Sequence, residues 1–167
     1  MKKRNGYYSS GECYRSALSN LLVCMGDTET AQKAFDAYSR HRLVGWDGMH
    51  TGTATVMLRE LTGGIYDGIL KLRSEYSEIL QSSTILCENA GDILSAISKE
   101  LDAGNIVFHS GRIERNGSSL YWVRRKIGGH WVVPIGNDMY IDNGTFRKNA
   151  NDLSIIGVLD VRKVSDK

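Results

Sequence analysis

The spacing of apolar residues changes along this chain, and the change limits the folds that it can adopt. In the first third, apolar side chains recur every three or four residues, as on one face of an amphipathic helix. From residue 105 onward, short runs rich in β-branched and aromatic residues alternate with turn residues, which is typical of strands. Helices that come first and antiparallel strands that come last predict an α+β protein.

The same patterns place the individual elements. The expected helices span residues 12–25, 28–41, 53–61 and 89–101. The expected strands span residues 65–72, 83–87, 105–109, 119–125, 129–133, 139–142 and 155–161. Ser9 or Ser10 can cap the first helix. With 167 residues and 41% hydrophobic composition, the chain can bury one sizeable core, so we predict a single domain over residues 1–167.

Composition and charge give no sign of a metal, cofactor or nucleic-acid site. The net charge is +2, and the densest basic run, Arg124 to Lys126, is expected to be a solvated turn. The three cysteines lack CxxC spacing, and neither a histidine metal motif nor a Gly-rich phosphate loop is present. We therefore expect reduced thiols, no metal, no cofactor and no nucleic-acid partner.

The N-terminal sequence MKKR is basic, but the apolar run of a signal peptide does not follow it. No stretch of the chain reaches the roughly 20 apolar residues that a membrane-spanning helix needs. We therefore expect a soluble, cytoplasmic protein without a membrane partner.

Two distant segments carry residues suited to thiol chemistry. Cys13 lies in the first turn of the expected first helix, where the helix dipole favours a thiolate. His130 and Asp142 lie on two expected strands that a short loop joins. A thiol nucleophile needs a nearby base, and the base needs a group that orients it. Cys24 and Cys87 are instead expected to be small, buried hydrophobic residues.

The loop between these two strands decides whether His130 and Asp142 meet. A five-residue loop centred on Gly136 would pair residues whose numbers sum to 272, so His130 would face Asp142 and donate a hydrogen bond to it. Pro134 is expected in the loop, because it cannot serve an interior ladder position. The opposite face would be apolar and pack on a core; it holds Trp131, Val133, Met139 and Ile141.

A different turn would give a different register. A two-residue turn at Asn137-Asp138 would place Val133, rather than His130, opposite Asp142. Whatever the register, Asp142 could also simply be a turn residue, since Asp-Asn-Gly readily forms turns.

At these residues the chain resembles the papain-like cysteine peptidases, most of all the peptidase domains that trim double-glycine leaders. One matching segment is Glu12-Cys13, which Ala17, Leu18 and Leu22 follow. The other is Gly-His-Trp-Val-Val at residues 129–133, which Ile141-Asp142 follows. The segment from Gly52 to Leu61 is similar to the connecting helix of such domains.

The resemblance implies a papain-like fold, in which an N-terminal helical part, with the nucleophile helix, packs on a C-terminal antiparallel β-sheet. It implies that Cys13, His130 and Asp142 form a catalytic triad that cleaves a peptide or protein substrate. The family carries a Gln six residues before the nucleophile as the oxyanion donor, and here that position is Tyr7. Tyr7, Asn5 or Ser10 would supply the donor, or the oxyanion hole is impaired. Loss of one such donor costs on the order of 10²–10³ in rate.

Three functions therefore follow as expectations. The first is a thiol peptidase or a related amidase, deamidase or acyl transferase that uses the triad. The second is a catalytically impaired papain-like domain that binds a peptide or protein, since Tyr7 replaces the usual Gln. The third is a nucleic-acid-associated accessory protein, for which the candidate contacts are Arg112, Arg115, Arg124, Arg125 and Lys126.

Overall fold

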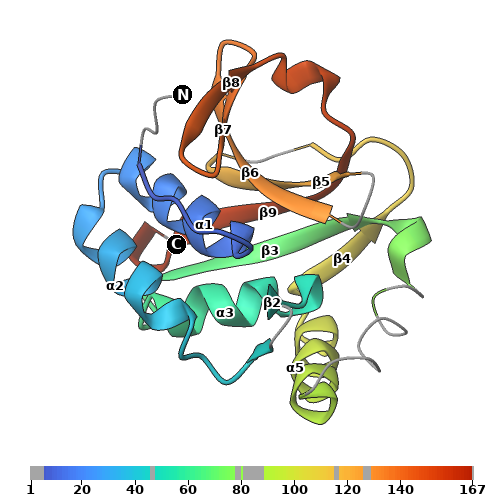
Figure 1. Cartoon of the computed structure of the whole chain (residues 1–167). Coiled ribbons are helices and arrows are strands. Elements are labelled where there is room, and N and C mark those ends of the chain that lie inside the picture. The colour runs from blue at the N-terminus through green and yellow to red at the C-terminus, as the bar shows by residue number, and fades with distance from the viewer. Residues whose placement is uncertain are drawn as a thin grey trace.

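The computed structural model describes residues 6–45, 48–77, 80, 89–114, 117–125 and 129–166 (Figure 1). In this part of the chain, four α-helices accompany a seven-stranded sheet, which confirms the α+β class. The helices are α1 (Cys13–Cys24), α2 (Thr28–Tyr38), α3 (Ala54–Leu61) and α5 (Ala90–Asp102). All four coincide with expected helices, although α2 ends three residues before the expected end at residue 41.

The main sheet has the order β4-β3-β9-β5-β6-β7-β8, and its only parallel pair among the described strands is β3 with β4. Its strands are β3 (Tyr66–Arg73), β4 (Ile106–His109), β5 (Ser119–Arg124), β6 (Gly129–Gly136), β7 (Met139–Asp142), β8 (Thr145–Lys148) and β9 (Ile155–Lys163). Two short strands, β1 (Val44–Gly45) and β2 (Gly48–Met49), form a separate hairpin. The expected strand 83–87 lies outside the described residues.

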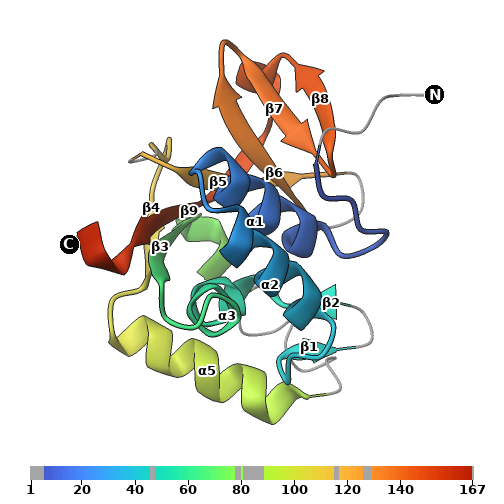
Figure 2. The same cartoon turned by 90° about the vertical axis from the view of Figure 1, so that its left-hand side faces the viewer.

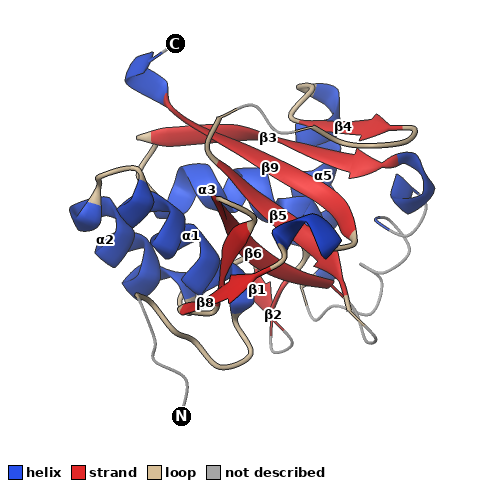
Figure 3. Ribbon diagram, turned by 90° about the horizontal axis from the view of Figure 1, so that it is seen from above, coloured by secondary structure: helices blue, strands red, loops and turns tan. Residues whose placement is uncertain are grey.

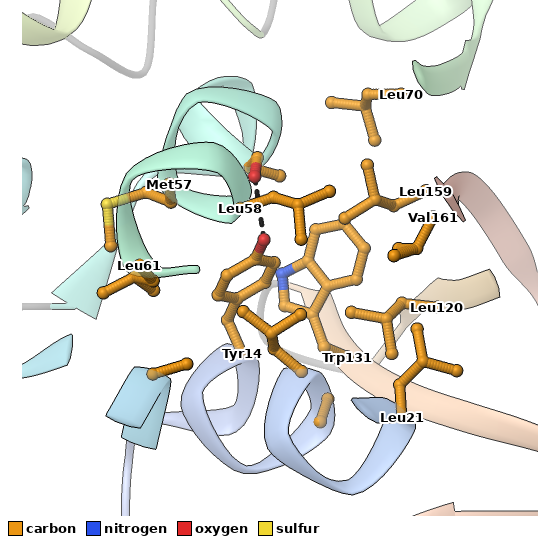
Figure 4. Close-up of a cluster of buried hydrophobic side chains, with 14 of the residues drawn as sticks. Tyr14, Leu21, Met57, Leu58, Leu61, Leu70, Leu120, Trp131, Leu159 and Val161 are labelled. Atoms are coloured by element: carbon orange, nitrogen blue, oxygen red, sulfur yellow. Dashed lines mark hydrogen bonds between the residues drawn. The ribbon is translucent and has the colours of Figure 1, made fainter. Parts of the chain in front are cut away.

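Helices α1, α2 and α3 lie on one face of the sheet (Figure 3). Figure 4 shows the core between them, where Tyr14 and Leu21 of α1 meet Leu58 of α3 and side chains of the central strands. The Tyr14 hydroxyl, which is fully buried, donates a hydrogen bond of 2.7 Å to the carbonyl of Ala54. Because Tyr14 follows Cys13 directly, this bond and the packing around it hold the start of α1 against α3.

The β6–β7 hairpin has the alternative two-residue turn, but beyond that turn it keeps neither of the two expected registers. Asn137 and Asp138 form a two-residue turn in which both have positive φ, 52° and 58°, as a type I′ turn requires. Next to this turn Gly136 pairs with Met139, but a β-bulge follows, and Val133 then pairs with Ile141. The sum of paired numbers therefore changes from 275 at the turn to 274 beyond the bulge. The five-residue loop was a wrong prediction, because the αL tendency of Asn and Asp favours the tight turn.

The bulge has a consequence for the side chains. It takes up one residue of β6, so the register beyond it differs from the predicted sum of 272 by two and each residue keeps the predicted face. Trp131, Val133 and Ile141 lie in the core, as expected, whereas Met139 is only partly buried. If this register continues past Val133 and Ile141, Asp142 lies across from Val132, and His130 is its diagonal neighbour on the same face.

Pro134 lies inside β6, not in the loop as expected, and pairs with Tyr140 of β7. The pairing of β6 with β5 reaches only Val132, so β6 is an edge on its other side at Pro134. A residue without an N–H is tolerated at such an edge beside a bulge.

The segment that precedes α1 fastens this helix to the far hairpin. Asn20, a buried residue of α1, accepts a hydrogen bond of 2.7 Å from the backbone N–H of Tyr7 and donates one of 3.0 Å to the Tyr7 carbonyl. Two residues later, the backbone N–H of Ser9 donates to the side-chain oxygen of Asn143, which follows β7. We call residues 6–9 the N-terminal strap.

The strap leaves no room for a side chain at Gly144, which gives a first prediction. A Cβ there would lie 2.7 Å from the Tyr7 carbonyl oxygen, and Gly144 has a φ of +82°. Gly144→Ala is expected to destabilise the fold by about 1–3 kcal/mol through the steric clash, in addition to the backbone strain. Urea unfolding measures the loss, with Gly26→Ala as the control, because Gly26 has a similar φ of +86° and open space around it. Equal losses in the two variants would show that the strap does not press on Gly144.

Candidate active site

Cys13 is the first residue of α1, and Glu12 occupies the N-cap position without a side-chain cap. The expected serine cap is absent, because the Ser9 hydroxyl donates instead to a Glu12 carboxylate oxygen at 3.0 Å. The same oxygen of Glu12 accepts a bond of 3.0 Å from Arg15. The charge of Glu12 is therefore partly compensated, which limits its opposition to a thiolate at Cys13.

His130 and Asp142 are hydrogen-bonded, as the sequence predicted. Nε2 of His130 lies 2.5 Å from Oδ1 of Asp142, and Asp142 is only 8% exposed. The residues meet as diagonal neighbours of β6 and β7, and not as directly opposed residues. Since Nε2 is bonded to Asp142, Nδ1 is the ring nitrogen that remains for the thiol of Cys13.

The thiol and the imidazole shift each other's pKa. Burial raises the pKa of Cys13, but hydrogen bonds from His130 and from the backbone N–H groups of Trp131 and Tyr14, together with the charge on His130, bring it below its ordinary value. Burial lowers the pKa of His130, but hydrogen bonds with Asp142 and Cys13 raise it to about 9. Both changes favour a thiolate–imidazolium pair near neutral pH.

Aromatic packing sets the positions of Cys13 and His130. Trp131, which follows His130, has its ring centroid 5.4 Å from that of Tyr14, which follows Cys13. Tyr14 and Trp131 are thus in contact within the core, and each is the next residue after Cys13 or His130. Behind them, the indole of Trp122 covers Gly129 so closely that a Cβ there would lie 2.1 Å from its Nε1. The residue before His130 must therefore be very small.

Sequence reasoning missed two arginines that belong to this site. Arg125 Nη2 lies 2.8 Å from Oδ2 of Asp142, and Arg147 Nε lies 3.1 Å from the same oxygen. The charges of His130 and Arg125, with their hydrogen bonds, outweigh burial and hold the pKa of Asp142 well below its usual range. Arg125 was assigned to a solvated turn, and Arg147 lies on β8, which was not expected. A basic residue next to a strand end is too common to have signalled this role.

Tyr7 does not fit the oxyanion role that the sequence suggested. Its hydroxyl donates a hydrogen bond of 3.0 Å to Gln32 of α2, and its ring packs against Phe35 with centroids 4.8 Å apart. The phenol is therefore committed to α2. Of the other candidates, Ser10 is exposed and Asn5 lies outside the described residues. The donors that do lie beside Cys13 are the first backbone N–H groups of α1, which have no intrahelical acceptor.

The structure also places the other cysteines and some of the basic residues that the sequence singled out. Cys24 ends α1 and is exposed, so the expectation of a buried residue was wrong; burial of part of its surface raises its pKa. Cys87, Arg115 and Lys126 lie outside the described residues. Arg124 contacts Tyr76 through a hydrogen bond, and its guanidinium lies 5.7 Å from the ring centroid.

Within the described part of the chain, no group of three or more His, Cys, Asp or Glu residues is arranged to hold a metal ion. The helices described are also all too short or too polar to cross a membrane.

Comparison with known proteins adds no relative. No protein-family model matches the chain, and no curated protein or solved structure is similar to it at a significant level.

Proposed function

We propose that the protein is a thiol hydrolase that cleaves a peptide or amide bond, with a papain-like arrangement of its active site. The observation that carries this proposal is the linked set of Cys13, His130 and Asp142, in which the thiol pKa is lowered and that of the imidazole is raised to about 9. An exposed thiol such as Cys24 has no such partner among the described residues. A paired thiolate is the reactive form in thiol catalysis.

The proposed reaction proceeds in two halves. The Cys13 thiolate attacks the carbonyl carbon, and backbone N–H groups at the start of α1 donate to the developing oxyanion. His130 then gives its proton to the leaving nitrogen, the C–N bond breaks, and a thioester remains. A water molecule attacks the thioester, its proton passes to His130, and the acid leaves as the thiolate is restored.

A covalent probe tests the proposal. Peptide vinyl sulfones are expected to label Cys13 and not Cys24, and labelling is expected to disappear in His130→Ala. Trypsin cleaves after Arg15 and so places the two cysteines on separate peptides for mass spectrometry. A Gly-Gly vinyl sulfone, compared with one that carries bulky residues, tests the similarity to leader peptidases. Equal labelling of Cys13 and Cys24 would reject an activated nucleophile.

The alternative is a peptide-binding domain without catalysis, and the commitment of the Tyr7 phenol to α2 favours it. This alternative predicts saturable binding of peptides with no covalent labelling and no hydrolysis. Retention of peptide binding in Cys13→Ala does not separate the two functions, but labelling of Cys13 by the vinyl sulfone does.

A further inference from the structure

The carboxylate of Asp142 accepts hydrogen bonds from three cationic side chains. Among the described residues, Oδ1 accepts only from His130, whereas Oδ2 accepts from Arg125 and Arg147. The donors come from three places in the sheet: the end of β5, the start of β6, and β8. β6, β7 and β8 form the end of the sheet beside α1 (Figure 2). Two strands on one side and one on the other thus reach the same carboxylate.

We propose that Arg125 and Arg147 are positioning residues that keep Asp142 ionised and oriented while His130 is neutral. The inference rests on the proposed function, because His130 becomes neutral when it gives its proton to the leaving group. At that step the only charge compensation that Asp142 receives at Oδ1 is lost. The side chain of Asp142 is 9% exposed, and a carboxylate so poorly hydrated is costly without a compensating charge.

The arginines supply that compensation permanently, because a guanidinium does not lose its proton in the working pH range. They also settle the orientation of the carboxylate. With both of them bonded to Oδ2, rotation of the carboxylate would break two bonds, so Oδ1 stays directed at His130 Nε2. The arginines are themselves 46% and 39% exposed, and they lie between the buried carboxylate and solvent.

Their partial exposure raises the question of whether these are ordinary surface ion pairs. Pairs of that kind contribute about 0–1 kcal/mol and tolerate removal. This case differs because the shared partner is buried and because one carboxylate faces two guanidinium groups and an imidazole. Among the described residues, Asp142 is the only acidic partner within 4.0 Å of either arginine.

The test is the double variant Arg125→Gln/Arg147→Gln, compared with Arg42→Gln/Arg73→Gln. The control also removes two positive charges, from the surface pairs with Glu60 and Glu75. ¹³C NMR of the Asp142 carboxyl group and ¹⁵N NMR of the His130 ring follow their titrations directly. In the test variant Asp142 is expected to gain its proton at a higher pH than in the wild type, whereas in the control its titration is unchanged.

Reactivity gives the second readout. The vinyl sulfone is expected to label Cys13 more slowly at pH 5 than at pH 7. The factor by which the labelling rate falls between these pH values is expected to be at least about ten times larger in the test variant than in the control. Arg125→Lys/Arg147→Lys keeps the charges, so it is expected to restore the Asp142 titration. If the double Gln variant does not fold, the single variants Arg125→Gln and Arg147→Gln carry the test, each with a smaller shift of the Asp142 titration to higher pH.

An unchanged Asp142 titration in the Gln variant would overturn the positioning role. Failure of the proposed function has a different signature. In that event wild-type Cys13 is not labelled at any pH, while the NMR titrations still report whether the arginines hold Asp142.

Discussion

Replacing His130 with alanine is expected to move the alkylation of Cys13 to higher pH. In the wild type, His130 lowers the pKa of Cys13 through a hydrogen bond and through its charge. The variant loses both, whereas burial, the largest influence, still raises the pKa of Cys13 and the backbone N–H groups of Trp131 and Tyr14 still lower it. The pKa of the Cys13 thiol should therefore rise above its wild-type value, and the thiol should react only at higher pH.

Iodoacetamide alkylation as a function of pH measures this effect without any knowledge of the substrate. Wild-type Cys13 is expected to be alkylated at pH values well below the pKa of free cysteine. Its alkylation rate should change again near pH 9, where His130 loses its proton. At pH 7 the rate for His130→Ala should be lower by at least about tenfold. His109→Ala, at an exposed position of β4, is the control. A Cys13 profile that is the same in all three proteins would show that His130 does not activate the thiol.

Gly129→Ala is expected to reduce hydrolysis or probe labelling by about 100-fold, because a displacement of about 1 Å at a reacting group has that effect. The new Cβ would lie 2.1 Å from Nε1 of Trp122, so either the indole or the backbone beside His130 must move. Trp122 is paired with Trp131 across β5 and β6, and their ring centroids are 6.3 Å apart. A shift of the indole would therefore also disturb the residue on the other side of His130.

The control for this variant is Gly91→Ala in α5, where a Cβ meets nothing within 4 Å. That substitution is expected to leave labelling unchanged and to be neutral or stabilising by up to about 1 kcal/mol. Urea unfolding separates the contributions, because Gly129→Ala should also lose about 1–3 kcal/mol to overpacking. Full labelling of Cys13 in a stable Gly129→Ala protein would show that the indole moves without affecting the site.

Helices and long strands were predictable because burial of one face imposes a period on the sequence. α1 and β9 bury most of their length, and both were found within two residues of their expected ends. β8 was missed because it is a four-residue edge strand with alternate residues exposed, including Phe146. β8 is defined by its hydrogen bonds to β7, and backbone hydrogen bonds produce no hydrophobic periodicity in the sequence.

The site was predictable where it depended on which face a residue occupies, and unpredictable where it depended on exact register. The predicted loop was wrong, but His130 and Asp142 still meet because they lie on the same face. The bulge near Pro134 takes up one residue of β6 and so returns each side chain to its predicted face. The arginines on Oδ2 of Asp142 could not be found in this way. Arg125 and Arg147 are 22 residues apart and converge only through the order of β5, β6, β7 and β8.

The N-terminal strap has a consequence for the order in which the protein can assemble. Ser9, just before α1, is bonded to Asn143, 134 residues later in the chain. Contacts of such long separation form late in folding, because the loop they close carries a large entropy cost. Synthesis delivers Cys13 early, yet the strap, the imidazole and the carboxylate that complete its surroundings all wait for the β6–β8 region. We therefore expect a nascent chain to expose Cys13 as an ordinary thiol until that region has emerged.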